Sequence, residues 1–317
     1  MANNRFMPRG WRWLIRHGPA PAIALAVSLA ATPARAQEVI HLEDGPVELT
    51  GDPIQLNLLL FDAAKDGYTD DVALLLRHGA SVAARDRNGN TALLLAAETS
   101  RTKLVEQLLD AGSAIDHRNL DGGTALLRAA AAGRGRIASA LIARGAAIDL
   151  ADKKDVTPLA AAAFGGDADL VRLLLEKGAK PDALDATGKT AITYAAARGF
   201  SKVVGLLLEA GVPVNARLGN DLTALMWAAG HSNDVPPREA AETLRLLLER
   251  GAEVDLTDNR GRTALMIGAS LGHAAAVAQL IDAGARLDTA DRAGKTALDL
   301  ATEAGAVDVV RLLRDKQ

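Results

Sequence analysis

The chain has 317 residues, of which 49% are hydrophobic and 24% charged, and it contains no cysteine. So large an apolar fraction excludes a disordered chain, and the lack of cysteine excludes disulfides, thiolate zinc sites, Fe–S clusters and a cysteine nucleophile. Aromatic residues make up only 3% of the chain, so the apolar side chains are chiefly Ala, Leu and Val. This composition favours close-packed helices over an all-β core.

The first 36 residues have the order of a secretory signal peptide. Four arginines between Arg5 and Arg16 precede an apolar stretch at 22–31, and Ala34-Arg35-Ala36 follows as a cleavage site. The apolar stretch is too short to cross a bilayer of about 30 Å as a helix. We therefore expect Sec export and cleavage after Ala36, with the product in the periplasm. An uncleaved anchor and an extracellular product are the alternatives.

Cleavage would change the charge balance. Residues 1–36 hold five arginines and no acid, so the remainder has 31 basic and 39 acidic residues and a formal net charge of −8. This balance disfavours binding to nucleic acid, which needs clustered Lys and Arg. No later stretch approaches 18 uninterrupted apolar residues, so no membrane span is expected after cleavage.

Beyond the leader, the dominant feature is an internal repeat. Its first marker is a Thr in a Thr-Ala-Leu-like triplet, found at Thr91, Thr124, Thr157, Thr190, Thr223, Thr263 and Thr296. Its second marker is a Gly in step with the Thr, found at Gly79, Gly112, Gly145, Gly178, Gly211, Gly251 and Gly284. The steps are 33 residues except for one of 40. Because the two markers recur with the same spacing and in step with each other, a chance coincidence is excluded.

Each repeat predicts two helices joined by turns. The Thr caps a short first helix, whose Ala-Ala pairs allow close approach to its neighbours. A Gly nine residues after the Thr, such as Gly166, ends that helix in a tight turn. A second helix then buries leucines such as Leu173-Leu174-Leu175, and the later Gly provides its left-handed cap.

These features resemble the ankyrin repeat family. Residues 152–184 are close to its pattern, with Thr157-Pro158-Leu159, Ala161-Ala162, Gly166 and Gly178-Ala179. The resemblance implies an all-α fold, an ankyrin-repeat α-solenoid of about eight helix-turn-helix units with projecting β-hairpin loops. It divides the chain into the signal peptide (1–36), a leader segment (37–52) and a repeat domain (53–317) with repeats at about 53–85, 86–118, 119–151, 152–184, 185–217, 218–257, 258–290 and 291–317.

The chain departs from the family in two places. The first repeat has Leu58 where the Thr should be, and no repeat has the His that the family usually places three residues after the Thr. We expect apolar packing to replace the hydrogen bonds of that His.

No motif supports catalysis, a cofactor or a metal site. Residues 268–272 match G-x-S-x-G, but Ser270 falls within a first helix. Residues 133–138 mimic a dinucleotide fingerprint without a preceding strand. The histidines show no metal-binding spacing, and His273 occupies a structural position of the repeat. We therefore predict a protein that is not an enzyme and holds no cofactor or metal.

The first candidate binding residues lie in the loops just before each Thr. The resemblance implies that these loops are hairpin tips on a concave binding face. The basic residues there are Arg87, Lys153, Lys154, Lys189, Arg260, Arg262, Arg292 and Lys295, and the acidic ones are Asp121, Asp155 and Asp221. The excess of five positive charges predicts an acidic patch on a protein partner. The alternative is that tips are simply polar and tolerate Lys and Arg.

The first helices supply the other candidates. Four positions after the Thr stand Arg128, Tyr194 and Trp227, which are either contact anchors or packing residues. Phe164, Arg198 and His231, seven or eight positions after their Thr, should be more exposed. The seven extra residues of repeat six fall near 230–237 and predict a polar loop between two helices, restarted at Pro236-Pro237. This insertion is either part of the binding face or the result of neutral drift in the length of the loop.

Three functions remain open. The first is a non-enzymatic periplasmic scaffold that binds another protein. The second is a secreted effector or toxin that binds a host or competitor protein, and the third is an accessory protein to an envelope enzyme in stress defence. The partner and the oligomeric state do not follow from these residues.

Overall fold

The computed structural model describes residues 39–42, 45–231 and 235–316. They belong to two compact units that divide after Ala114. The predicted signal peptide lies outside the described residues. Within them, no helix has the length and apolar character needed to cross a membrane.

The first unit opens with a β-hairpin that the sequence did not predict. Strand β1 (Val39–Leu42) pairs antiparallel with β2 (Gly45–Glu48), with Val39 opposite Glu48. Strand β1 lies against helix α3 (Thr69–Arg77), and Ile40 is fully buried. Residues 39–42 and 45–48 of the leader segment are therefore part of the fold. Two strands of four residues are too short to show a clear period of two in the sequence.

Four helices follow the hairpin in the described part of the first unit. They are α2 (Pro53–Asp66), α3, α4 (Ala92–Ala96) and α5 (Thr102–Asp110). Helix α2 begins without the repeat's Thr because the carboxylate of Asp52 accepts a hydrogen bond from the Ile54 amide at 3.0 Å. Pro53 occupies the first helical position, where no amide hydrogen is needed. An Asp-Pro start thus replaces the missing Thr.

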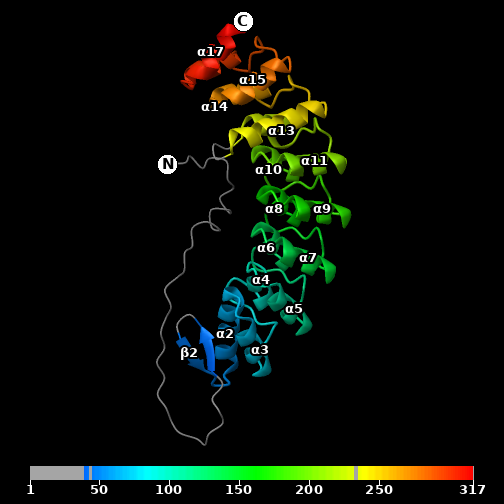
Figure 1. Ribbon diagram of the computed structural model, residues 1–317, viewed down its shortest axis with the longest axis vertical. Coiled ribbons are helices and arrows are strands. Elements are labelled where there is room, and N and C mark those ends of the chain that lie inside the picture. The colour runs from blue at the N-terminus through cyan, green and yellow to red at the C-terminus, as the bar shows by residue number, and fades with distance from the viewer. Residues whose placement is uncertain (1–38, 43–44, 232–234, 317) are drawn as a thin grey trace, which may run out of the picture. The chain divides into compact units, whose positions relative to one another are not determined.

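The second unit repeats one pair of helices six times (Figure 1). The inner helices, which follow each Thr, are α6 (Ala125–Ala131), α8 (Pro158–Gly165), α10 (Ala191–Ala197), α12 (Ala224–Ala229), α14 (Ala264–Leu271) and α16 (Ala297–Glu303). The outer helices are α7 (Gly135–Ala143), α9 (Ala168–Glu176), α11 (Ser201–Glu209), α13 (Pro237–Glu249), α15 (Ala274–Asp282) and α17 (Val307–Asp315). Inner helices pack on inner helices and outer on outer, in two layers. The predicted all-α helical repeat fold is confirmed.

The helix boundaries follow the residues that predicted them. The hydroxyls of Thr124, Thr157, Thr223, Thr263 and Thr296 accept an amide hydrogen bond from the first turn of their helices. At the other end of helix α8, Gly166 has a φ of +74°, a left-handed conformation that costs an L-residue about 1 kcal/mol or more. The Ala-Ala pairs and one leucine of each triplet, such as Leu174, form the core.

The predicted hairpin loops are tight turns of five residues, which we call tip turns. In tip turn 185–189, the Asp185 amide donates to the Lys189 carbonyl at 2.8 Å, and the Asp185 carboxylate accepts the Thr187 and Lys189 amides at 2.7 and 3.0 Å. The backbone bond recurs in the turns at 86–90, 119–123, 152–156, 218–222, 258–262 and 291–295. The side-chain bonds recur where Asp or Asn opens the turn and are missing at 218–222, which Leu218 opens. The repeated Asp therefore builds the turn, as its spacing predicted.

Backbone hydrogen bonds join neighbouring tip turns of the second unit. Lys153 N donates to the Asp121 carbonyl at 2.8 Å, and Ala186 N donates to the Lys154 carbonyl at 2.9 Å. Three further bonds run from Gly219 to Gly188, from Asn259 to Asn220 and from Arg292 to Arg260. These bonds join neighbouring repeats through backbone groups, so they do not depend on the His that the repeats lack.

A second series of bridges joins the loops behind the outer helices. The side chain of Asp116 accepts the Ala147 amide at 2.9 Å, and Asp149, Asn215 and Asp255 accept the amides of Lys180, Glu253 and Arg286. At one junction between repeats this hydrogen bond cannot form. The residue whose amide should donate there is Pro213, which has no amide hydrogen.

The insertion in repeat six is only partly a loop. Helix α13 has 13 residues where α11 has nine, so four of the seven extra residues add a turn at its N-terminus. The other three lengthen the connection, and residues 232–234 lie outside the described part. The sequence prediction of a loop alone is therefore corrected, although the helix does begin at Pro237 as expected. Val235 is buried and packs over the turn glycine Gly199.

Candidate protein-binding surface

The inner helices of repeats three to seven contain no acidic residue. Alanine makes up half or slightly more of each of helices α6, α8, α10 and α12, and the Ala-Ala pairs are buried. The charged residues of this layer are Arg128 on α6 and Arg198 at the end of α10. This layer is therefore apolar and basic, although the chain as a whole is slightly acidic.

Tyr194 lies at the centre of this layer as a packing residue. It is only 5% exposed, and its hydroxyl donates a hydrogen bond to Asp185 of the adjacent tip turn. Burial by itself raises the pKa of Asp185, but hydrogen bonds from Tyr194 and from the turn bring that pKa below its ordinary value. Burial and the nearby carboxylate raise the pKa of Tyr194. Of the two roles predicted for Tyr194, the structure selects packing.

Lys189 lies over two aromatic rings beside this pair. Its Nζ is 5.7 Å from the centre of the Tyr194 ring and 5.3 Å from that of Trp227, within range of a cation–π interaction. Trp227 is half-buried, and its indole N–H is enclosed without a hydrogen-bond acceptor among the described residues. Such a donor is uncommon in a folded core.

A second cation covers the neighbouring rings. The guanidinium of Arg198 lies 4.9 Å from the centre of the Phe164 ring and 5.6 Å from that of Phe200. Phe164 in turn meets Tyr194 edge to face, with ring centres 5.8 Å apart. Phe164 and Arg198 are consequently half-buried, less exposed than their spacing had predicted.

His231 is also half-buried, because its ring stacks on that of His273 with centres 3.9 Å apart. Nδ1 of His273 donates to the Ala229 carbonyl oxygen at 2.9 Å, which links repeats six and seven. Burial lowers the pKa of His273, the hydrogen bond to Ala229 opposes this, and the charge of His231 lowers it further. The predicted structural role of His273 is consistent with this geometry.

The lowered pKa of His273 makes stability depend on pH. The unfolded chain takes up a proton near the ordinary pKa of 6.5 while the folded chain resists it, so the free energy of unfolding falls as the pH drops below that value. We expect the thermal unfolding midpoint to fall between about pH 8 and pH 5, above the range in which carboxylates titrate. The His273→Ala variant should lose much of this slope. An equal slope in both proteins would contradict the assignment.

The tip turns are less basic than the sequence count suggested. Arg260 pairs with Asp258 at 2.9 Å, Arg262 with Asp291 at 3.0 Å and Lys295 with Glu303 at 2.7 Å. The count omitted the Asp that opens five of the seven turns, and including Asp86, Asp152, Asp185, Asp258 and Asp291 gives eight acidic residues against eight basic ones. The predicted excess of charge over all tips is therefore corrected.

The candidate residues do not form one surface. Arg128, Phe164, Lys189, Tyr194, Arg198 and Trp227 lie on or beside four consecutive inner helices, and we call them the central surface. Lys153 and Lys154 are exposed on the tip turn bonded to that of Lys189. Arg260, Arg262, Arg292 and Lys295 belong to later tip turns, and Arg87 belongs to the first unit.

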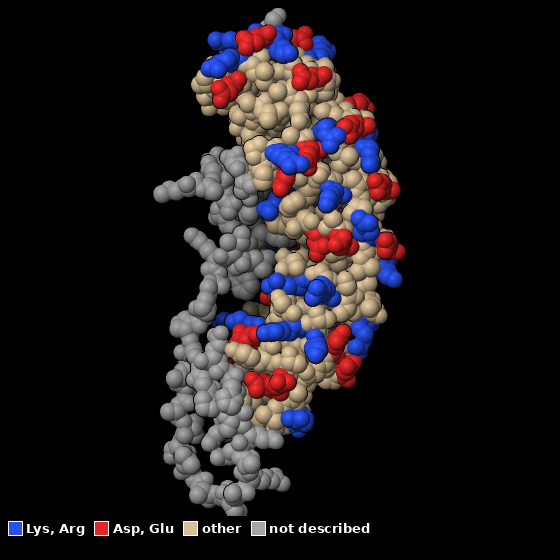
Figure 2. Space-filling view, in the orientation of Figure 1, with Lys and Arg blue, Asp and Glu red and all other residues tan. Residues whose placement is uncertain are grey.

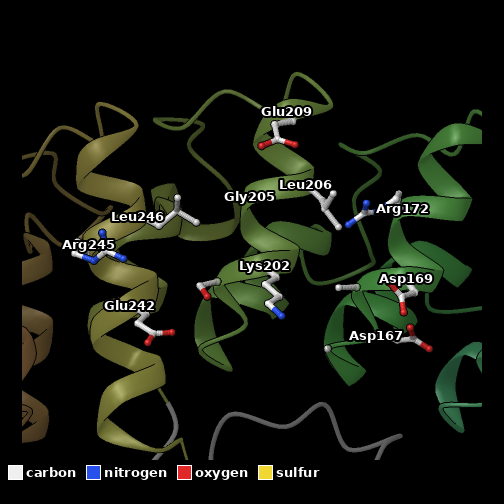
Figure 3. Close-up of a pocket in the computed structure, with 13 residues that line it drawn as sticks. Asp167, Asp169, Arg172, Lys202, Gly205, Leu206, Glu209, Glu242, Arg245 and Leu246 are labelled. Atoms are coloured by element: carbon white, nitrogen blue, oxygen red, sulfur yellow. The ribbon is translucent and has the colours of Figure 1, made fainter.

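The outer helices carry a hollow that the sequence analysis missed (Figure 3). It has a volume of about 760 Å³ and lies across α9, α11 and α13. Gly205 forms its floor, between Arg172 and Arg245 at the matching positions of the neighbouring helices. A Cβ at Gly205 would touch only Leu246 at 3.8 Å, so an alanine would fit. The sequence did contain a signal for this hollow, because Gly205 stands at a repeat position that Arg172 and Arg245 occupy in the neighbouring helices.

The charges around this hollow favour no single kind of ligand. The acidic side chains of Asp167, Asp169, Glu209 and Glu242 line it together with the basic side chains of Arg172, Lys202 and Arg245. Figure 2 shows the same mixture of Lys and Arg with Asp and Glu over the second unit. The central surface, with no acidic residue on its helices, differs clearly from this mixed surface.

The motifs that imitate catalytic sites lie in ordinary repeat positions. Ser270 belongs to helix α14 and its hydroxyl donates to the Ile267 carbonyl, whereas a nucleophile elbow needs a strand before the serine. Residues 133 and 134 lie in the turn between α6 and α7, and residues 135–138 form the start of α7. In the described part of the chain, no three His, Asp or Glu side chains are placed to hold a metal ion. The absence of catalysis, cofactor and metal stays a prediction.

A comparison with protein families decides what this repeat is. The family model of ankyrin repeats matches residues 60–153, 101–185, 136–217, 159–236 and 237–317. The chain belongs to the ankyrin repeat family. No individual curated protein matches it. Ankyrin repeats generally serve as protein–protein interaction scaffolds, so the central surface is the candidate binding surface of an ankyrin-repeat chain.

Proposed function

We propose that this ankyrin-repeat protein is a non-enzymatic scaffold in the periplasm that binds another protein through its inner helices and tip turns. The observation that carries the proposal is the central surface. Phe164 and Trp227 stay half-buried there beside Lys189 and Arg198, on helices without an acidic residue. Aromatic and arginine side chains of this kind dominate the binding energy of protein interfaces.

Two further features support the proposal. The signal-like order of residues 1–36 supports export. The exposed Lys153 and Lys154 lie next to the central surface and support an acidic partner.

The test is a pull-down from the osmotic-shock fraction of cells that express the full, tagged chain. We expect the chain in that fraction with a bound protein, and we expect Lys153→Glu with Lys154→Glu to reduce capture about tenfold at low salt. The matched control changes the charge equally on the outer helices, with Arg172→Glu and Lys202→Glu, and should leave capture unchanged. Recovery mainly in the growth medium, or equal capture by both variants, would contradict the proposal.

A further inference from the structure

Lys189 is a cation of the central surface that has no carboxylate partner. Its Nζ lies over the rings of Tyr194 and Trp227, and it forms no ion pair with a described residue. The carboxylate of Asp185 already accepts the Tyr194 hydroxyl and the amides of its own turn. Helices α10, α12 and α14 contain no Asp or Glu. The ammonium group is therefore positioned by the rings and left for an anionic group from outside.

Large apolar side chains continue this surface from α12 onto α14. Ile267 stands at the repeat position that Trp227 occupies on α12, and Leu271 lies one turn further along α14. A Cβ on Gly230, which ends α12, would lie 3.0 Å from Cγ2 of Ile267 and 3.6 Å from Cδ1 of Leu271, so both side chains reach across to α12. We call Lys189, Trp227, Ile267 and Leu271 the Trp227 face.

The apolar part of this face is exposed beyond what the repeat needs. Leu271 is 42% exposed, and it is the one exposed large apolar side chain on the described inner helices of the second unit. The matching residues of repeats three, four and eight are Ala132, Gly165 and Ala304, so the stack forms without a leucine at this position. Trp227 and Ile267 beside it are half-buried. Contiguous apolar side chains at a surface, next to a cation, are typical of a protein-interaction site.

We infer that the Trp227 face binds a segment of the protein partner in which one acidic residue and one large apolar residue lie close together. The carboxylate pairs with Lys189, and the apolar side chain covers Trp227 and Leu271. One short segment reaches both, because the cation and the apolar side chains meet on either side of a single helix, α12. This inference rests on the proposed function, since it names the chemistry of the partner at part of the same surface.

The test uses random linear peptides displayed against the full chain with Trp11→Phe and Trp13→Phe. These two changes leave Trp227 as the only tryptophan, so tryptophan fluorescence reports on this face alone. We expect the enriched peptides to combine Asp or Glu with a large apolar residue. As synthetic probes they should shift the emission of Trp227 to shorter wavelength, because binding removes water from its indole ring. Enriched peptides without an acidic residue, or binding without this shift, would overturn the inference.

Two substitutions separate the charged from the apolar contact. Lys189→Gln should weaken binding of an enriched peptide about fivefold at low salt, and Lys189→Arg, which keeps the charge, should bind as the unchanged protein does. Leu271→Ala should also weaken binding about fivefold, but equally at low and high salt, because an apolar contact is not screened. The matched controls are Lys202→Gln on outer helix α11 and Leu184→Ala, an exposed leucine outside the inner helices. Both should leave binding unchanged.

Thermal unfolding of each variant separates lost binding from lost folding, because only variants with an unchanged midpoint are compared. Peptide binding that survives both Lys189→Gln and Leu271→Ala would contradict the inference, and so would a selection that enriches no peptide. A protein captured from the osmotic-shock fraction would still support the proposed function in each of these cases, so the two proposals fail separately.

Discussion

The Gly199→Ala variant should lose about 2–4 kcal/mol of unfolding free energy, far more than an alanine costs at most surface positions. Gly199 has a φ of +74°, and a Cβ there would lie 2.6 Å from Cγ1 of Val235 and 3.3 Å from the backbone of Glu239. The added methyl group must therefore enter the left-handed region and also displace the insertion of repeat six. Chemical denaturation of the full chain measures the loss.

Gly133 provides the matched control for this prediction. It occupies the same repeat position with a φ of +67°, but a Cβ there meets no atom within 4 Å. Gly133→Ala should therefore cost only the backbone part, about 1 kcal/mol. Adding Val235→Ala to Gly199→Ala should relieve part of the clash and recover part of the lost unfolding free energy. A double-mutant cycle would show this as a favourable coupling. Equal losses for the two glycines would show that Val235 does not pack where the structure has it.

The Asp185→Ala variant should lose about 2–4 kcal/mol, because one carboxylate closes a tip turn and also receives a buried hydroxyl. Without Asp185, the Thr187 and Lys189 amides lose their acceptor, and the Tyr194 hydroxyl is left buried and unpaired. The lowered pKa of Asp185 has the same origin. It adds stability above the ordinary pKa near 3.8 that is lost as acid protonates the folded chain.

Asp152 isolates the contribution of Tyr194. It closes tip turn 152–156 by accepting the Lys154 and Val156 amides at 2.8 and 3.0 Å, but the residue equivalent to Tyr194 is Ala161. Asp152→Ala should therefore cost about half as much, roughly 1–2 kcal/mol. Combining Asp185→Ala with Tyr194→Phe should bring the loss close to that of Asp152→Ala. If Asp185→Ala cost no more than Asp152→Ala, the Tyr194 hydrogen bond would contribute nothing.

The repeat itself could be predicted from local chemistry. Thr, Gly and Asp recur because each satisfies a backbone requirement of its own turn or helix end, and such requirements are visible in a single sequence. The paired helices and the placement of Ser270 within one of them followed directly. The start of α2 at Pro53 was missed because Asp52, and not a Thr, caps this helix.

The central surface was only partly predictable, because it depends on contacts between repeats. The sequence located Tyr194 and Trp227 at one repeat position, but burial differs between them because Asp185 holds the hydroxyl of Tyr194. Charge was misjudged for a similar reason, since Arg262 finds its carboxylate in the next repeat, at Asp291. The added turn of α13 was missed because proline permits both a loop and a helix start.

The backbone hydrogen bonds between tip turns all run in the same direction. In each of them the later repeat donates an amide hydrogen and the earlier repeat offers a carbonyl oxygen, from Lys153 and Asp121 onward. In the side-chain bridges behind the outer helices, a backbone amide of the later repeat likewise donates to a side chain of the earlier one, as in Ala147 and Asp116, although Asn215 also donates its side-chain amide to the Gly251 carbonyl. The stack of repeats is therefore directional, and its two ends differ. A duplicated 33-residue unit inserted in frame would join both neighbours with the bonds they already use, which lets such an array change its length without redesign.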